Sequence, residues 1–296
     1  MTARRIFKIL MITFGSVFLL TVMLVAALRW VNPPVTAYML ETRSHLSDKA
    51  GHPVALRQQW VSIDQIAGVM PLAAVASEDQ TFPTNWGFDW SAIQKAIHYN
   101  RHHRHLHGAS TITQQTAKNL FLWSGKSYFR KALGVYFAVL IDTLWPKRRV
   151  LEVYLNIAQF DPRVFGIKAA AAHFFSERPA HLSAAQAALL AATLPAPDAY
   201  SVTDPSQYMR HRQHWIINQM YHLGDGYLTG VGLHPAHLPA HTSPARAKPG
   251  QNPLPAAGMG TSGQGQRSSQ GITGSPSGNQ SEFPQSQGQP QGQTQG

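Results

Sequence analysis

The chain begins with a long apolar segment. An uncharged run of 20 residues extends from Ile9 to Leu28, between Lys8 and Arg29. A helix of this length, at about 1.5 Å per residue, crosses a hydrocarbon core of roughly 30 Å. A cleaved signal peptide is the alternative, but its apolar region is usually shorter, and residues 25–27 resemble a cleavage site only loosely. We therefore expect an uncleaved transmembrane helix at residues 9–28, preceded by a short N-terminus at 1–8.

Beyond this span the pattern has the period of α-helices. Asn32-Pro33-Pro34 ends the first helix, and residues 29–60 form a connector. At 91–99 apolar residues recur at intervals of three and four, and Ser183 is a plausible N-cap for a helix that ends before Pro195. No series of alternating strands is present. The sequence therefore predicts a mainly α domain at 61–225.

The stretch at 130–157 is apolar on most faces and is interrupted by Pro146. Proline cannot continue a helix, because it lacks an N–H and clashes with the preceding turn. This pattern predicts a buried central helix, followed by a second helix that begins after the proline.

The composition changes sharply beyond about Pro244. From Pro249 onward the chain consists largely of Gln, Gly, Ser and Pro, with almost nothing to bury. Such a segment cannot offset the entropy cost of ordering, so we expect a low-complexity, disordered tail, assigned to residues 226–296.

Charge indicates the kind of partner. The chain has 25 Lys and Arg against 14 Asp and Glu, a formal net charge of +11. This balance favours anionic partners such as phosphates and lipid head groups. No nucleic-acid-binding module is recognisable, and the apolar span makes membrane lipid the better candidate. The absence of cysteine excludes disulfides, thiolate metal sites and a cysteine nucleophile.

Three segments carry candidate chemistry. At residues 76–90, ASEDQTFPTNWGFDW places the acidic pair Glu78-Asp79 among apolar and aromatic residues. At 107–122, HGASTITQQTAKNLFL surrounds Lys118 with small and hydroxyl residues. At 130–160, RKALGVYFAVLIDTLWPKRRVLEVYLNIAQF begins with the cations Arg130 and Lys131.

Together these segments resemble the monofunctional biosynthetic peptidoglycan transglycosylases of glycosyltransferase family 51, which polymerise lipid II into glycan strands. The resemblance implies a lysozyme-like α-helical glycosyltransferase domain on a single transmembrane helix. It implies that Glu78 takes the proton from the acceptor hydroxyl in an inverting transfer that releases undecaprenyl pyrophosphate, and that Asp79 supports Glu78. It also implies substrate-binding roles for Ser110, Thr111, Gln115, Lys118, Lys126, Arg130 and Lys131.

The resemblance also implies the partners. These are lipid II, the growing glycan strand and membrane lipids, with cell-division or elongation synthases as further candidates. No cofactor is required, while Mg²⁺ or Mn²⁺ is an optional contributor because divalent ions commonly neutralise a pyrophosphate leaving group. His102, His103, His105 and His107 lie beside arginines, and we expect them to contact anionic head groups rather than a metal.

Four positions depart from the family pattern. Asn85 stands where the family has histidine, and Gly134 stands where it has a second catalytic glutamate. Gln159 and Asp161 lie near positions where close relatives tend to have an acid and a glycine. On a straight helix Asp142 would be rotated by roughly 80° from position 134, so it is a poor substitute for that glutamate.

These departures leave alternatives open. One is a catalytically impaired scaffold that binds lipid II or a partner synthase, and another is a lytic, lysozyme-like hydrolase. We expect the protein to be located in the cell inner membrane. Arg4, Arg5 and Lys8 precede the apolar span, which predicts a cytoplasmic N-terminus and a periplasmic catalytic domain.

Overall fold

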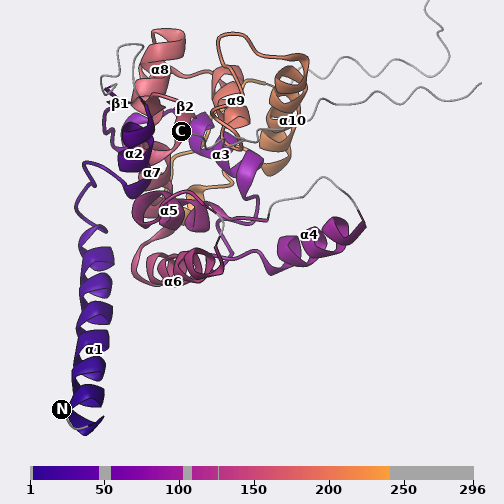
Figure 1. Ribbon diagram of the computed structural model, residues 1–296. Coiled ribbons are helices and arrows are strands. Elements are labelled where there is room, and N and C mark those ends of the chain that lie inside the picture. Colours follow the sequence, from indigo (N-terminus) through magenta and orange to yellow (C-terminus); the bar gives the residue numbers. More distant parts are fainter. Residues whose placement is uncertain (1–2, 47–54, 103–108, 126, 241–296) are drawn as a thin grey trace, which may run out of the picture. The chain divides into compact units, whose positions relative to one another are not determined.

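The computed structural model describes residues 3–46, 55–102, 109–125 and 127–240. Over these residues the chain is mainly α-helical, as predicted (Figure 1). The helices are α1 Ala3–Ala27, α2 Ala37–His45, α3 Val69–Glu78, α4 Trp90–His102, α5 Ile112–Phe121, α6 Tyr128–Leu144, α7 Lys147–Ile157, α8 Ile167–Phe175, α9 Ala184–Thr193 and α10 Gln207–Leu223. Three single turns of 3₁₀ helix are η1 Ile63–Gln65, η2 Pro179–His181 and η3 Thr229–Val231. The strands are β1 Arg57–Gln58, β2 Gln159–Asp161 and β3 Val164–Phe165.

Helix α1 is long and apolar enough to cross a membrane. Most of its side chains are exposed, but its C-terminal part packs on α6. The hydroxyls of Thr21 and Tyr136 lie 2.6 Å apart, and the Trp145 indole N–H donates to the Val25 carbonyl at 2.7 Å. The end of α1 is therefore attached directly to the helical domain.

Arg149, near the start of α7, completes this attachment. Its guanidinium donates to the carbonyl oxygens of Leu28 and Val31, each at 2.9 Å, and to the Asn32 side-chain oxygen at 2.9 Å. The last carbonyls of a helix have no partner within the helix and carry partial negative charge. A buried cation therefore satisfies the end of α1 where Asn32-Pro33-Pro34 stops it.

The core is built around α3, α7 and α9. Helix α3 is buried from Val69 to Ala76, and α7 from Arg149 to Ile157 except at Glu152. Helix α9 is rich in buried alanine, and such small side chains let α3 and α10 pack closely against it. The expected break at Pro146 is confirmed, because α6 ends at Leu144 and α7 begins at Lys147.

The expectation of a buried helix before Pro146 is wrong. In α6 only Ala138 and Ile141 are buried, while Phe129, Val135 and Val139 are exposed. Helix α6 contacts α5 and α1 on part of its surface. Another part faces an open groove, so its apolar residues are not explained by the core.

A small sheet ties the start of the domain to its centre. The strand order is β1-β3-β2, with β1 parallel and β2 antiparallel to β3. Beside it, the buried Asn156 amide accepts from the Val61 N–H at 2.8 Å and donates to the Val61 carbonyl at 2.9 Å. Gly166, with φ of 78°, brings the backbone so close that a Cβ would lie 2.5 Å from the Asn156 carbonyl. These contacts hold Val61 and the end of β3 against the last turn of α7.

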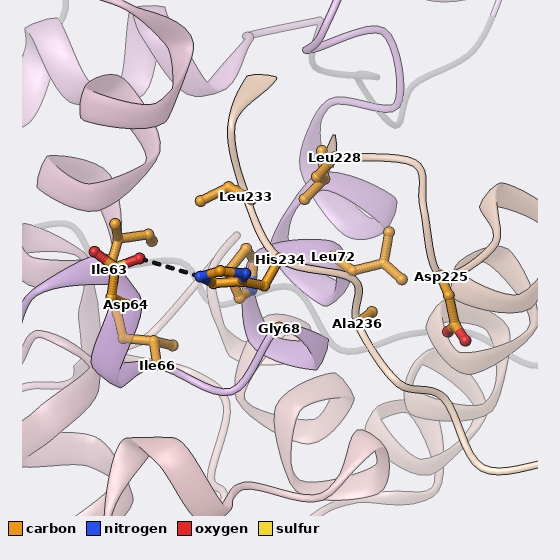
Figure 2. Close-up of a pocket in the computed structure, with 11 residues that line it drawn as sticks. Ile63, Asp64, Ile66, Gly68, Leu72, Asp225, Leu228, Leu233, His234 and Ala236 are labelled. Carbon is orange, nitrogen blue, oxygen red and sulfur yellow. Dashed lines mark ion pairs between the residues drawn. The ribbon is translucent and has the colours of Figure 1, made fainter. Parts of the chain in front are cut away.

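The packed part of the chain continues beyond residue 225, where the tail was expected to begin. Leu228, Leu233 and Ala236 are buried against the segment that leads into α3 (Figure 2). Gly68 allows this approach, since a Cβ there would lie 2.7 Å from the Pro235 carbonyl. The His234 ring lies 3.7 Å from the Asp64 carboxylate, and a dashed line marks this pair in Figure 2. The Gln, Gly, Ser and Pro-rich residues after 240 lie outside the described part.

Candidate functional site

Glu78 is the last residue of α3, with its side chain 10% exposed. One carboxylate oxygen accepts from the Gln115 amide at 2.8 Å, and the other accepts from the Ser77 hydroxyl at 3.1 Å. The Arg212 guanidinium of α10 lies 3.6 Å from the carboxylate. Helices α3, α5 and α10 thus hold Glu78 in one position, with donors suited to an ionised carboxylate.

Tyr154 fixes the orientation of Gln115. Its hydroxyl donates to the Gln115 amide oxygen at 3.1 Å, so the amide nitrogen points to Glu78. Tyr154 is fully buried in α7, and burial together with the charges of Glu78 and Asp79 raises its pKa well above the ordinary value. The phenol therefore stays protonated and remains a donor.

The Asp79 carboxylate is hydrogen-bonded to other groups of the protein. Its carboxylate accepts from the Asn85 amide at 2.8 and 3.0 Å, from the Ile112 N–H at 3.1 Å and from the Thr81 hydroxyl at 3.2 Å. Burial raises the pKa of Asp79, although these bonds and Lys147 oppose the shift. Asp79 therefore joins the end of α3 to the start of α5, beside Glu78.

Asn85 extends this arrangement to α7. Its amide oxygen accepts from the Lys147 ammonium at 2.9 Å, and the same ammonium lies 2.7 Å from Asp142. One Asn85 side chain thus donates to Asp79 and accepts from Lys147. Asp142 is committed to this ion pair, which agrees with the view that it does not replace a carboxylate at 134.

The hydroxyl of Thr111 also forms hydrogen bonds within the protein, both as donor and as acceptor. It is the N-cap of α5, accepting from the Gln114 N–H at 3.2 Å, and it donates to the Gly87 carbonyl at 2.6 Å. A substrate-binding role was predicted for Thr111, whereas its described contacts are those of a helix cap. The neighbouring Ser110 is exposed and lines two cavities.

The predicted cations fall into two groups. Lys118 lines a polar cavity, and its pKa is lowered by burial and by the charge of Arg130, with Glu78 opposing the shift. Lys131 lines a separate, mostly apolar groove. Lys126 lies outside the described residues, as do His103, His105 and His107, while His102 ends α4.

Glu78 lines one cavity, and two further cavities lie near it. A groove of about 670 Å³ between α4 and α6 is lined by Ser110 and Lys131 and by apolar side chains that include Trp86, Phe88, Trp90, Ile97, Val135 and Val139. A second cavity, of about 220 Å³, contains Glu78 and shares Ser110 with the groove. A third, of about 270 Å³, is polar and contains Lys118 and Gln115. Glu78 is therefore connected to the apolar groove through Ser110 and to the polar cavity of Lys118 through Gln115, which donates to its carboxylate.

Position 134 lies on α6, in a normal helical conformation. A Cβ there would meet only the Leu122 Cδ1, at 3.5 Å, so a larger residue fits. An acid from another helix interacts with the start of this region: the Glu41 carboxylate of α2 accepts from the Ser124 N–H and hydroxyl, each at 2.5 Å. Burial acts to raise the pKa of Glu41. The hydrogen bonds from Ser124 and the charges of His45 and Arg130 outweigh burial, so the pKa is lowered.

Sequence reasoning singled out neither Glu41 nor Arg212 nor Tyr154. Arg212 is one of several basic and histidine residues on α10, and Tyr154 is one of several apolar residues on α7. Within the described ranges there is no group of three His, Asp or Glu residues that could hold a metal ion.

Comparison with known proteins gives a consistent result. Residues 47–221 match the family model described as Transglycosylase. The chain is 45% identical over 217 residues to a biosynthetic peptidoglycan transglycosylase of Pasteurella multocida, covering 73% of this chain and 88% of that protein. It is 47% identical over 230 residues to one of Pseudomonas syringae pv. syringae, covering 77% and 95%. It is 48% identical over 209 residues to one of Pseudomonas fluorescens, covering 70% and 87%.

Proposed function

The chain belongs to the transglycosylase family and is a peptidoglycan glycosyltransferase that polymerises lipid II, and from this premise we propose that Glu78 is its catalytic base. The observation that carries the proposal is the position of Glu78, which is held by Gln115, Ser77 and Arg212 in a cavity that adjoins the apolar groove, while Gln115 also lines the polar cavity of Lys118. The non-catalytic alternative is not favoured, because the relatives compared are all named as transglycosylases.

The reaction requires one proton transfer and one displacement. Glu78 takes the proton from the 4-hydroxyl of the acceptor sugar, and the oxygen forms a bond to the anomeric carbon of the donor. The bond from that carbon to the pyrophosphate breaks, its electron pair leaves with the phosphate oxygen, and the configuration inverts. A base and preorganised positive charge each lower the barrier to such a step.

Lys118 and Arg130 are proposed to stabilise the departing pyrophosphate. An electrostatic observation supports this role, because the two cations lie close enough for the charge of Arg130 to lower the pKa of Lys118. Two neighbouring cations repel one another, so a pyrophosphate between them relieves the repulsion while its own charge is neutralised.

The groove between α4 and α6 is proposed to receive the prenyl chain of lipid II. Its walls are largely apolar, and Lys131 stands among them as a candidate for the attached phosphate. Ser110, shared with the cavity of Glu78, would then contact the substrate between the lipid and the sugar. Thr111 would act on the substrate only indirectly, by holding Ser110 at the start of α5.

A divalent cation remains an optional contributor. Since the described residues offer no cluster of metal ligands, we propose that Mg²⁺ or Mn²⁺, where it takes part, is carried by the pyrophosphate oxygens. Chelation with EDTA should then reduce the rate without changing the thermal stability of the protein. A loss of stability on chelation would contradict this assignment.

The apolar N-terminal helix indicates a membrane-anchored enzyme. We propose that it spans the cell inner membrane with the N-terminus in the cytoplasm, because Arg4, Arg5 and Lys8 precede it. The catalytic domain then lies in the periplasm, where cell-division or elongation synthases would be its protein partners. Fusions of reporter enzymes after residue 240 test the orientation: activity of a cytoplasm-only reporter would reject it.

Polymerisation of labelled lipid II in liposomes tests the role of Glu78. Glu78→Gln keeps the size of the side chain but cannot accept the proton, so we expect a loss of at least about a hundredfold in kcat. The control is Glu177→Gln, which changes an exposed acid that lies 3.8 Å from His181. Equal loss in both variants, or full activity of Glu78→Gln, would exclude Glu78 as the base.

A further inference from the structure

The side chain of Gln159 is committed at both ends. Gln159 lies in β2, directly after α7, and is only 4% exposed. Its amide nitrogen donates to the Asp198 carboxylate at 2.9 Å, and its amide oxygen accepts from the Tyr38 hydroxyl at 2.7 Å. Only an amide satisfies this pair of partners, because a carboxylate at 159 would face the Asp198 carboxylate with no proton between them.

Asp198 is held by this bond at the edge of the polar cavity. It lies in the loop that follows α9, and it lines the cavity of about 270 Å³ together with Lys118, Asn119 and Gln115. Its residue surface is exposed, so at least part of the carboxylate is free to accept another hydrogen bond. The cavity therefore has a carboxylate on one wall and an ammonium on another.

Asn119 supplies a further acceptor. Its side-chain oxygen is buried and receives no hydrogen bond from the described part of the protein. A buried acceptor without a donor costs free energy, which a ligand that brings an N–H or O–H group recovers. Asp198, Asn119 and Lys118 thus line one cavity next to Gln115, the residue that binds Glu78, although the Asn119 oxygen itself becomes available to a ligand only when its side chain turns.

This combination suits a sugar that carries hydroxyl and acetamido groups and is attached to a phosphate. The hydroxyls and the acetamido N–H are donors for Asp198 and Asn119, and the phosphate is an anion for Lys118. We propose that Asp198 is a substrate-binding residue whose carboxylate, positioned by Gln159 and Tyr38, accepts a hydrogen bond from the sugar of lipid II. This inference rests on the proposed function and assigns a specificity-determining residue to it.

A purely structural role is the competing explanation, since Asp198 also fixes its loop through Gln159. Asp198→Asn separates the two. The asparagine oxygen still accepts from Gln159, so the loop contact is kept while the charge is removed. We expect the KM for lipid II to rise about tenfold, with kcat changed by less than about threefold and the melting temperature unchanged. Asp204→Asn, an exposed acid of the same connection that does not line the cavity, should behave as wild type.

A double variant makes the test stricter. Gln159→Glu alone sets two carboxylates against each other and should lower both the melting temperature and activity. Adding Asp198→Asn restores an amide–carboxylate pair in the reversed order, so the melting temperature should recover. The KM should remain high, because the carboxylate is now buried at 159. Recovery of KM together with stability, or an unchanged KM in Asp198→Asn alone, would overturn the inference.

Binding distinguishes failure of the inference from failure of the proposed function. Labelled lipid II is titrated in detergent into Glu78→Gln protein, with and without Asp198→Asn. A Kd about tenfold higher in the double variant supports the role of Asp198 even where no variant polymerises lipid II. An equal Kd rejects it even where the wild-type enzyme is active, and absence of any lipid II binding by either protein rejects both.

Discussion

At Gln115, the orientation of one amide decides whether Glu78 receives a hydrogen bond or faces another oxygen. Tyr154 selects the productive orientation by donating to the amide oxygen. Tyr154→Phe removes that donor, so the amide can turn and Glu78 loses part of its alignment. We expect kcat to fall about tenfold and the free energy of unfolding to fall by about 1 kcal/mol, because the half-buried Gln115 oxygen loses its hydrogen bond. Kinetics and thermal melting check this, with the exposed Tyr208→Phe as control; normal kcat in Tyr154→Phe would contradict it.

Asp79 makes the stability of the folded chain depend on pH. Burial raises its folded-state pKa, so the folded chain binds more protons than the unfolded chain, whose Asp has a pKa of about 3.9. The stability contribution is complete below the unfolded pKa and is lost as the pH rises through the folded pKa. Asn85→Asp adds a second carboxylate beside Asp79, only partly compensated by Lys147, which is already paired with Asp142.

We therefore expect the free energy of unfolding of Asn85→Asp to decrease more steeply with pH than that of wild type, between about pH 4 and 7. Urea unfolding at a series of pH values measures the slope. Thr84→Asp adds the same charge at an exposed position of the same turn. Equal slopes for the two variants would show that the added charge does not act through Asp79.

Several site residues could be predicted at this scale, and others could not. Glu78, Gln115 and Lys118 lie in dense motifs whose residue types match the chemistry, and the structure places them around one group of cavities. Arg212 and Asp198 reach the same region from α10 and from the loop after α9. Their contacts join segments that are far apart in sequence, and spacing along the chain carries no signal of such contacts.

At the scale of elements, Gly134 is an unfavourable residue within α6. A helix-interior glycine costs about 1 kcal/mol relative to alanine, and the space around its Cα is open apart from Leu122. Gly134→Gln and Gly134→Glu should both raise the free energy of unfolding by about 0.5–1 kcal/mol. If a carboxylate here acts on the donor, only Gly134→Glu should raise kcat, by up to about a hundredfold.

Thermal melting and lipid II polymerisation separate the two effects. Greater stability without a change in kcat in both variants would mean that this enzyme does not use a carboxylate at 134. Lower stability of Gly134→Gln would contradict the open space described around this position.

Element boundaries followed from local chemistry more reliably than burial did. Pro146 ends one helix and Ser183 caps another, as predicted, because proline geometry and N-cap hydrogen bonds are local. Burial of α6 was wrongly expected from its apolar composition. An apolar face looks the same in sequence whether it meets a core, a lipid-facing groove or a membrane helix, and α6 meets both a groove and α1.

At the scale of the whole molecule, Arg149 joins the membrane helix to the catalytic domain. Arg149→Gln shortens the side chain and removes the charge, so the carbonyls of Leu28 and Val31 lose their donor. We expect a loss of about 3 kcal/mol in the free energy of unfolding, since hydrogen bonds from a charged group are the stronger ones. Limited proteolysis should also cut faster at residues 28–36. The exposed Arg210→Gln is the control, and an unchanged cleavage rate in Arg149→Gln would contradict this role.

The extent of the packed domain could be predicted only in part. A disordered tail was predicted from composition with its start at residue 226, whereas Leu228, Leu233 and Ala236 belong to the core. These apolar residues are isolated among Gly, Pro and His in a segment without helical period. Their burial depends on the close approach at Gly68, which no property of the segment itself reveals.

The contact between Arg149 and the residues at the end of α1 links the membrane helix to the alignment of Glu78. Helix α7 carries Arg149 near its start and Tyr154 further along, and Tyr154 orients the amide that binds Glu78. A transmembrane helix adjusts its tilt to the hydrophobic thickness of the bilayer. Because Leu28 and Val31, directly after α1, are hydrogen-bonded to Arg149 of α7, we expect a change in tilt to reach the helix that aligns the base. We therefore expect the polymerisation rate to vary with bilayer thickness as well as with the concentration of lipid II.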